Sequence, residues 1–187
     1  MRYPDLFVPT AIEVIELPSG VMVQVPKTEP IFELWKGKPL GDTYGNKTVL
    51  DSGGEPVFAE LAILRICQRD GWQGVWVDSF RNKFRTDYPA SDGVLPLEQQ
   101  RLLSGIYEKA GSKKGCWDVF CWRDDGTYLF VESKRQGHDR VRDSQRRWLE
   151  AAINCGLPTS AFLIVEWKVE DLAYTPRFTH HGSRFTY

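Results

Sequence analysis

Two short runs near the middle of the chain, at 117–122 and 127–132, are mostly hydrophobic and are separated by polar residues. Both runs are rich in aromatic and β-branched residues, which favour strands. The segment Asp124-Asp125-Gly126 separates them and has the composition of a tight turn. The pattern therefore predicts a β-hairpin.

The length of the hairpin loop decides which side chains share a face of the sheet. If the loop has three residues, with Gly126 in the left-handed conformation, Asp118 lies opposite Glu132. Side chains alternate with period two, so Lys134 then lies on the same face as both acids. A two-residue turn would instead pair Asp118 with Ser133 and turn Glu132 away. A joint role for the two acids therefore requires the three-residue loop.

Two acids and a lysine on one face have a definite chemical use. Opposed carboxylates on paired strands lie about 5 Å apart, and their repulsion favours a cation between them. Oxygen ligands select hard ions such as Mg²⁺ or Mn²⁺, which commonly bind through one or two carboxylates and substrate phosphate oxygens. A lysine beside the ion can position the attacking water and offset charge on the phosphate. The alternative is that Lys134 only neutralises Glu132 on a solvated strand.

Two helices are predicted before and after the hairpin, and each places one polar residue on its apolar face. The run 57–70 has helical periodicity and carries Glu60 among its apolar positions. The run 141–155 does the same with Gln145, three residues before Trp148. Burying a polar group without a partner is costly. Both side chains are therefore expected to face a cation, a water network or a cavity.

Other segments predict additions to these elements. Residues 11–17 and 21–25 predict a second hairpin, followed by a short strand at 32–35. This N-terminal part is either a β-layer covering the core or an arm that faces a substrate. Residues 72–80 predict a strand, and 96–109 predict a helix.

Basic residues gather around the predicted hairpin and the helix that follows it. The candidates for phosphate contact are Lys113, Lys114, Arg135, Arg140 and Arg142. A loop with Arg81, Lys83 and Arg85 lies where a flap contacting nucleic acid would lie. The formal net charge of −1 does not decide the matter, because a local basic face is sufficient for binding DNA.

Length and composition fit one compact soluble enzyme domain with peripheral additions. The 187 residues include 42% hydrophobic and 26% charged residues, which is ordinary for a folded protein. No apolar run approaches the roughly 20 residues that cross a bilayer, and the N-terminus lacks a signal-peptide segment, so no membrane contact is expected. The four cysteines lack the two-residue spacing of zinc or redox sites, which indicates reduced thiols and a cytoplasmic location.

The order of these elements and polar residues resembles that of the PD-(D/E)xK nuclease superfamily. The residues that carry the resemblance are Glu60, Asp118, Glu132, Ser133, Lys134 and Gln145. The VRR-Nuc branch is the most similar, on the basis of the Glu-x-Lys strand, a Gln-x-x-Trp helix at 145–148, Gly156 and an apolar strand at 161–165. The resemblance covers about 57–167.

The resemblance implies a role for each of these residues. Asp118 and Glu132 would be the main metal ligands, with the backbone carbonyl of Ser133 as another. Lys134 would orient or activate the attacking water. Glu60 would contact a metal, directly or through water, and a residue of the second helix, Gln145, would brace the site or the nucleophile. Lys134, Glu60 and Gln145 are thus the predicted catalytic residues.

The chain departs from the family at one position. Family members usually have proline or glycine before the first aspartate, whereas Trp117 precedes Asp118 here. In the register above, Trp117 points to the opposite face of the sheet, so we expect the substitution to be tolerated.

The resemblance implies an α/β fold with a restriction-endonuclease-like core. This core would be a mixed central β-sheet of about four strands flanked by helices, in the order αβββαβ, with N-terminal β additions. The expected organisation is a β-rich extension packed on the core at 1–50, a nuclease-like domain at 51–170 with an insertion at 81–112, and a C-terminal tail at 171–187.

The expected function is Mg²⁺- or Mn²⁺-dependent hydrolysis of DNA phosphodiester bonds, and the resemblance favours structure-selective cutting. RNA is an alternative substrate, because the sequence has no signature for or against sensing the 2′-hydroxyl. A homodimer is one arrangement for cutting both strands of a duplex. The competing hypothesis is a catalytically inactive nuclease-fold module that binds nucleic acid or a protein partner. The lysine beside two acids argues against this module, because a pure binding face does not need it.

Overall fold

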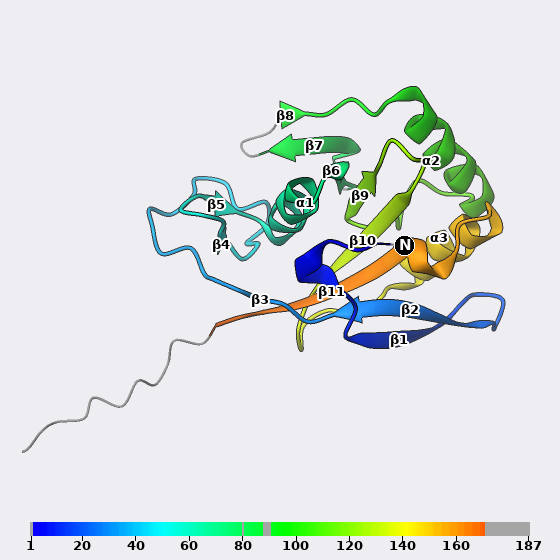
Figure 1. Cartoon of the computed structure of the whole chain (residues 1–187), viewed down its shortest axis with the longest axis horizontal. Coiled ribbons are helices and arrows are strands. Elements are labelled where there is room, and N and C mark those ends of the chain that lie inside the picture. Colours follow the sequence, from blue (N-terminus) through cyan, green and yellow to red (C-terminus); the bar gives the residue numbers. More distant parts are fainter. Residues whose placement is uncertain (1, 80, 88–90, 171–187) are drawn as a thin grey trace, which may run out of the picture.

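The structure is a computed structural model that describes residues 2–79, 81–87 and 91–170. The predicted C-terminal tail at 171–187 and the predicted end of a strand at Phe80 lie outside these residues. Within them, a central mixed β-sheet is flanked by three α-helices (Figure 1). No helix in this part of the chain is long and apolar enough to span a membrane.

The sheet contains nine strands in the described residues, in the order β1-β2-β11-β10-β9-β6-β7-β8, and β3 pairs with β11. These strands are β1 (Ala11–Glu16), β2 (Met22–Thr28), β3 (Ile31–Phe32), β6 (Gln73–Asp78), β7 (Lys83–Asp87), β8 (Ser91–Asp92), β9 (Val119–Trp122), β10 (Tyr128–Arg135) and β11 (Phe162–Val169). The remaining elements are β4 (Leu50–Asp51), β5 (Pro56–Val57), α1 (Ala59–Arg69), α2 (Leu97–Ala110), α3 (Asp143–Asn154) and the 3-10 turns η1 (Asp5–Phe7) and η2 (Thr159–Ala161). Strands β10 and β11 run parallel, whereas β9 runs antiparallel to β10 and β6.

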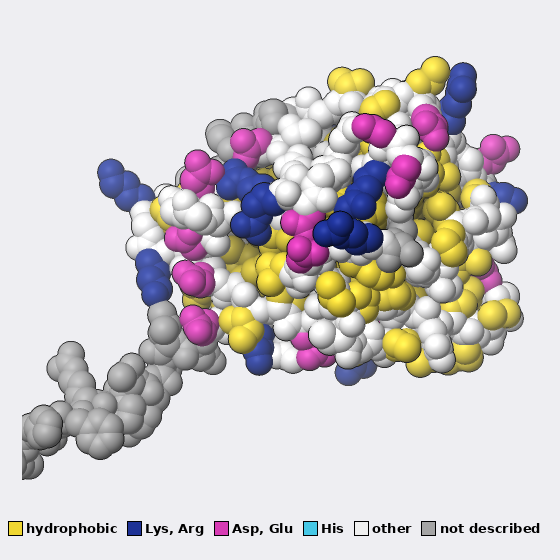
Figure 2. Space-filling model, viewed as in Figure 1, with side chains coloured by type: hydrophobic (Ala, Val, Ile, Leu, Met, Phe, Trp, Pro, Cys, Tyr) yellow, Lys and Arg dark blue, Asp and Glu magenta, His cyan; other side chains and the backbone are white. Residues whose placement is uncertain are grey.

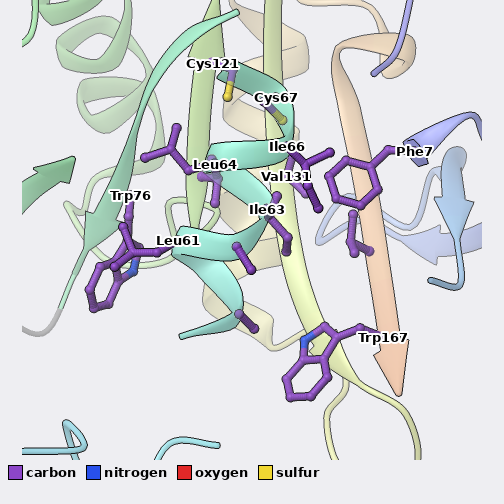
Figure 3. Close-up of a cluster of buried hydrophobic side chains, with 14 of the residues drawn as sticks. Phe7, Leu61, Ile63, Leu64, Ile66, Cys67, Trp76, Cys121, Val131 and Trp167 are labelled. Carbon is purple, nitrogen blue, oxygen red and sulfur yellow. The ribbon is translucent and has the colours of Figure 1, made fainter. Parts of the chain in front are cut away.

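The central strands are apolar on both faces and are covered on both. Helix α1 packs on one face, where its residue Leu64 and Val131 of β10 belong to the same buried cluster (Figure 3). Helices α2 and α3 cover the other face, where the Trp148 ring lies 5.0 Å from the Phe130 ring, edge to face. Burial of apolar surface on both sides fixes the sheet between the helices.

The sheet is larger than the four strands predicted. The N-terminal hairpin β1–β2 forms as expected, but β2 pairs in parallel with β11 and so continues the sheet. At the other edge, β7 pairs with β6. Pairing between segments far apart in sequence is not encoded in local periodicity, which explains the difference.

The predicted helices are present with adjusted ends. The helix predicted from residue 57 begins at Ala59, because Pro56 and Val57 pair with β4. It ends before Gly71, which has a left-handed φ of 81°. The helix predicted at 141–155 is α3, and the one predicted at 96–109 is α2.

The hairpin β9–β10 has the predicted three-residue loop. The Arg123 amide donates to the Thr127 carbonyl at 3.0 Å, and Gly126 is left-handed with a φ of 78°. The pairs from Trp122 with Tyr128 to Val119 with Val131 follow this register, and Asp118 and Glu132 are the next residues along the two segments. The predicted register is therefore confirmed.

The predicted position of Trp117 is wrong. Its ring lies 5.3 Å from the Phe162 ring, within the cluster beneath α2 and α3 and not on the α1 face. Residues 115–118 precede the regular part of β9, so strict alternation does not yet apply to them. The bulky residue is accommodated by burial in the core.

Gly115 allows the start of β9 to approach the start of α3. A Cβ atom at this position would lie 2.1 Å from the carbonyl oxygen of Ser144, and the φ of 91° also disfavours side chains. The contact brings Asp118 and Gln145, both within three residues of it, to the same end of the sheet. At Gly126, by contrast, φ is positive but nothing lies within 4 Å of an added Cβ.

These two glycines provide a matched test of the close approach. We expect Gly115→Ala to lower the free energy of unfolding by about 3 kcal/mol or more, because α3 must shift. Gly126→Ala should cost only about 1 kcal/mol, from backbone conformation alone. Urea denaturation measures both values. Equal losses would contradict the role assigned to Gly115.

Candidate active site

A cavity of about 500 Å³ opens where β6 and β10 end and α3 begins. The side chains predicted to act together all line it: Glu60, Asp118, Glu132, Lys134 and Gln145. They come from α1, from the residue before β9, from β10 and from α3. Sheet register and helix periodicity therefore bring these polar groups to one place.

Glu132, Lys134 and Gln145 form a buried hydrogen-bonded network. Oε1 of Glu132 accepts from Nζ of Lys134 at 2.8 Å and from Nε2 of Gln145 at 2.5 Å. Oε1 of Gln145 accepts from the same Nζ at 3.2 Å and from the backbone amide of Arg142 at 2.9 Å. The Gln145 side chain therefore caps the N-terminus of α3 and also fixes the acid and the lysine.

Oε2 of Glu132 has no hydrogen-bond partner among the described residues, although it is buried. An unsatisfied buried carboxylate oxygen is costly unless a cation or a proton meets it. Burial accordingly raises the pKa of Glu132, although Lys134 opposes the shift. The orphan oxygen makes this carboxylate a ready acceptor for a positive group.

Asp118 is half-buried and faces Glu132 across the two strands. Its Oδ2 accepts a hydrogen bond from the backbone amide of Ser133 at 3.0 Å. Burial raises the pKa of the Asp118 carboxyl well above its usual range, and the charges of Glu132 and Glu60 raise it further. Lys47 opposes this shift. Asp118 therefore lies among buried acids that disfavour its charged form.

Glu60 reaches the cavity from α1 but is already paired. It is only 6% exposed, and it forms a short salt bridge with Lys47, which comes from the loop before β4. Glu60 was predicted to contact a metal. The structure brings it to the same cavity as Asp118 and Glu132, with a lysine as its direct partner.

The donor set fits a hard ion held by two carboxylates. No group of three acidic, histidine or cysteine side chains in the described residues is arranged to hold a metal ion unaided. Asp118 and Glu132 both line the cavity, and the buried Oε2 of Glu132 lacks a partner there. Mg²⁺ usually binds through one or two carboxylates and keeps several waters or substrate oxygens. The pair therefore suits such an ion and is too small a set for a closed metal cage.

The five predicted phosphate contacts do not converge on the cavity. Arg142 lines it, Arg140 lines an adjoining cavity that shares Lys134, and Lys113 lines a third cavity beside α2. Lys114 lines none of the three, and Arg135 donates to the Thr48 hydroxyl at 2.9 Å. Figure 2 shows Lys and Arg side chains interspersed with Asp and Glu on one face of the molecule, without a continuous basic surface.

The predicted flap at 81–85 is instead part of the sheet edge. Arg85 lies in β7, is 3% exposed, and donates to Oδ2 of Asp78 at 2.9 Å. Arg81 lines the cavity and stacks over the Tyr44 ring, with its guanidinium carbon 4.0 Å from the ring centre. Only part of the predicted flap is therefore placed to meet a ligand.

Sequence reasoning did not assign Tyr44, Lys47 or Asp78 to the site, although all three line the cavity. Arg81 was predicted only as part of a flap. Asp78 ends β6 directly after three buried apolar residues, and an acid at the end of such a strand was a usable signal. Lys47 and Tyr44 lie in a loop without periodicity, so no local pattern connects them to the site.

Residues 91–166 match the family of the VRR-NUC domain. The matched segment includes Asp118, Glu132, Lys134 and Gln145, whereas Glu60 and Lys47 lie before it. No curated protein and no solved structure matches the chain.

The raised pKa of Asp118 predicts that the site destabilises the metal-free protein. A carboxyl whose pKa is raised in the folded state lowers stability as pH rises above its unfolded pKa. In the presence of a chelator at pH 7 to 8, Asp118→Asn should therefore raise the melting temperature by at least about 3 °C. The difference from the unaltered protein should shrink as pH falls toward 5, because the folded carboxyl takes up its proton first. A variant that melts below the unaltered protein at pH 8 would contradict this electrostatic description.

Proposed function

We propose that this protein, whose residues 91–166 belong to the VRR-NUC family of the PD-(D/E)xK nuclease superfamily, hydrolyses DNA phosphodiester bonds with a divalent metal ion. Membership of the family implies a nuclease-type function. The observation that carries the finer proposal is the buried network of Lys134, Glu132 and Gln145 beside Asp118.

The element order supports a restriction-endonuclease-like core. Along the chain, α1, β6, β9, β10, α3 and β11 give helix, three strands, helix and strand, which is the order αβββαβ. Strands β7 and β8 and helix α2 are inserted between β6 and β9. The remaining strands at the N-terminus extend the sheet beyond this core.

Asp118 and Glu132 would hold Mg²⁺ or Mn²⁺, the two hard ions that carboxylate and phosphate oxygens favour. The Ser133 carbonyl would be the third protein ligand. The Ser133 N–H donates to Asp118. Because the N–H and C=O of one strand residue face the same neighbouring strand, the Ser133 carbonyl also points toward the Asp118 side. The Ser133 hydroxyl is turned elsewhere, because it accepts from the indole of Trp167 at 2.9 Å. When bound, the ion supplies positive charge and Lewis acidity at the phosphate.

Lys134 is the residue that would act on the attacking water. Its ammonium group has three N–H donors, of which Glu132 and Gln145 each engage one. The remaining donor can hold a water oxygen in line with phosphorus, and the positive charge stabilises the negative charge that develops on the phosphate. The two fixed partners orient the amine before substrate arrives.

Gln145 would be a positioning residue. Its amide donates to Glu132 and accepts from Lys134, so it holds the metal ligand and the lysine in one geometry. Supporting residues of this kind usually contribute 10- to 100-fold to metal affinity or activity.

DNA is the substrate that the nuclease family favours, and Arg142 at the rim is placed to contact its backbone. Structure-selective cutting is part of the proposal on the basis of family resemblance. RNA is an alternative substrate, which its 2′-hydroxyl distinguishes from DNA.

Lys134→Ala tests the proposed reaction directly. The variant should lose cleavage of a labelled panel of linear, nicked, flapped and branched DNA and RNA with Mg²⁺ or Mn²⁺, by at least about 100-fold. Lys109→Ala is the control, because Lys109 is exposed on α2 and lines none of the three cavities. Cleavage by Lys134→Ala at the rate of the control would remove this mechanism.

The same substrate panel distinguishes the proposed nuclease from a catalytically inactive module that only binds nucleic acid or a protein. An inactive binding module would cut none of the substrates and bind no Mn²⁺ in calorimetry. Asp118→Asn would then change neither metal binding nor DNA affinity, whereas the proposed enzyme loses its metal binding in this variant.

Gln145→Leu tests the positioning role, since it keeps the side-chain volume and removes both polar groups. We expect cleavage to fall 10- to 100-fold and the free energy of unfolding to fall by about 1 to 3 kcal/mol, because buried partners lose hydrogen bonds. Gln136→Leu is the control, as this side chain is exposed after β10. A lower free energy of unfolding with an unchanged cleavage rate would contradict the positioning role and leave Gln145 only as a cap of α3.

A further inference from the structure

The loop before β4 inserts a second lysine into the candidate active site. Lys47 lines the cavity with Glu60, Asp118 and Glu132, and it forms a salt bridge with Glu60. Its side chain is 37% exposed, so a ligand in the cavity can reach it. Lys47 lies outside the segment 91–166 that matches the family, and nothing in the proposed mechanism uses it.

The backbone of this loop adopts conformations that side chains rarely take. Tyr44, Gly45 and Asn46 all have positive φ, at 49°, 83° and 65°. Gly45 adopts a positive φ freely and Asn46 tolerates it, but at Tyr44 this conformation costs about 1 kcal/mol or more and persists where surrounding contacts enforce it. The Tyr44 ring supplies these contacts, because it packs edge-on against the rings of Phe58 at 5.3 Å and Trp76 at 5.8 Å. The strained turn is therefore anchored and delivers Lys47 to a fixed place.

Glu60 has the geometry of a residue that holds Lys47. The carboxylate is almost fully buried in the first turn of α1, and its partner is the lysine amine. It does not join Asp118 and Glu132 in a group that could bind a metal, within the part of the chain that the structure describes. A buried carboxylate with a fixed ammonium partner does not need a metal ion to satisfy it.

Lys47 keeps the capacity to bind an anion while it is paired. An ammonium group has three donors, and the salt bridge to Glu60 uses one. Burial lowers the pKa of Lys47, but the charges of Glu60, Asp118 and Asp78 outweigh this effect, so the amine stays protonated. A phosphate that enters a cavity rich in carboxylates needs such a fixed cation, and lysine binds phosphate as a point charge.

We propose that Lys47 is a second active-site lysine that binds a phosphate group of the DNA substrate, and that Glu60 positions this lysine and is not a metal ligand. The proposal rests on the nuclease function proposed above and adds a substrate contact to it. It also assigns the N-terminal loop a direct part in the site.

DNA binding tests the role of Lys47 in a Lys134→Ala background, where cutting does not interfere. Fluorescence anisotropy with a labelled flapped duplex over a salt series should show that Lys47→Met weakens binding about five- to tenfold. The slope of log affinity against log salt should fall by about one, as expected for one lost phosphate contact. Lys47→Arg should keep the slope, and Lys109→Met is the matched control. An affinity and slope equal to those of Lys109→Met would overturn the proposal.

Metal binding tests the role of Glu60 independently of activity. In calorimetry with Mn²⁺ alone, Glu60→Gln should keep its dissociation constant within about threefold, whereas Asp118→Asn should abolish binding. Glu60→Gln should weaken DNA binding only when Lys47 is present, because it acts through that residue. Loss of Mn²⁺ binding in Glu60→Gln would make Glu60 a ligand and overturn the assignment.

The two sets of measurements separate failure of this inference from failure of the proposed function. If the protein binds no Mn²⁺ and cuts nothing, the proposed nuclease function fails, and Lys47 is judged from the salt slope alone. A second outcome is that the protein binds Mn²⁺ and cuts DNA, but Lys47→Met tightens Mn²⁺ binding more than tenfold and leaves DNA affinity unchanged. Lys47 would then only neutralise the acids until the metal ion displaces it. That result would overturn the inference and leave the nuclease function intact.

Discussion

The candidate site depends on one electrostatic constraint: carboxylates are buried together, and the lysines that pair with them leave one buried carboxylate oxygen without a partner among the described residues. Glu132 is satisfied at one oxygen by Lys134 and Gln145 and unsatisfied at the other. Asp118 lies beside it, and burial together with neighbouring charge raises its pKa. A protein tolerates this arrangement when the missing charge comes from a ligand, since polar groups left without partners cost stability. Strain of this kind is typical of functional sites.

The surrounding fold supplies the rigidity that the constraint requires. Apolar clusters on both faces of the sheet hold β9 and β10; Asp118 directly precedes β9, and Glu132 lies in β10. The close approach at Gly115 brings α3 to the start of β9, so that Gln145 meets Glu132. On the opposite side, the aromatic contacts of Tyr44 fix the loop that carries Lys47. The site is thus preorganised from four separate parts of the chain.

Local sequence patterns predicted the groups that regular elements carry. The turn residues at 124–126 set the register that pairs Asp118 with Glu132, and helical periodicity turned Glu60 and Gln145 inward. The same reasoning misplaced Trp117, since alternation does not extend beyond the regular strand. It did not predict that β2 and β7 extend the central sheet, or that Lys47 enters the site, because long-range pairing and an irregular loop leave no periodic signal.

The central claim is that Asp118 and Glu132 together capture a hard divalent ion next to Lys134. Crystals of the protein soaked in Mn²⁺ test it most directly, through anomalous scattering from the bound ion. We expect a single strong peak between the two carboxylates, within about 2.0 to 2.3 Å of an oxygen of each. No peak there at saturating Mn²⁺, or a peak held by other residues while the two carboxylates stay as described, would contradict the account.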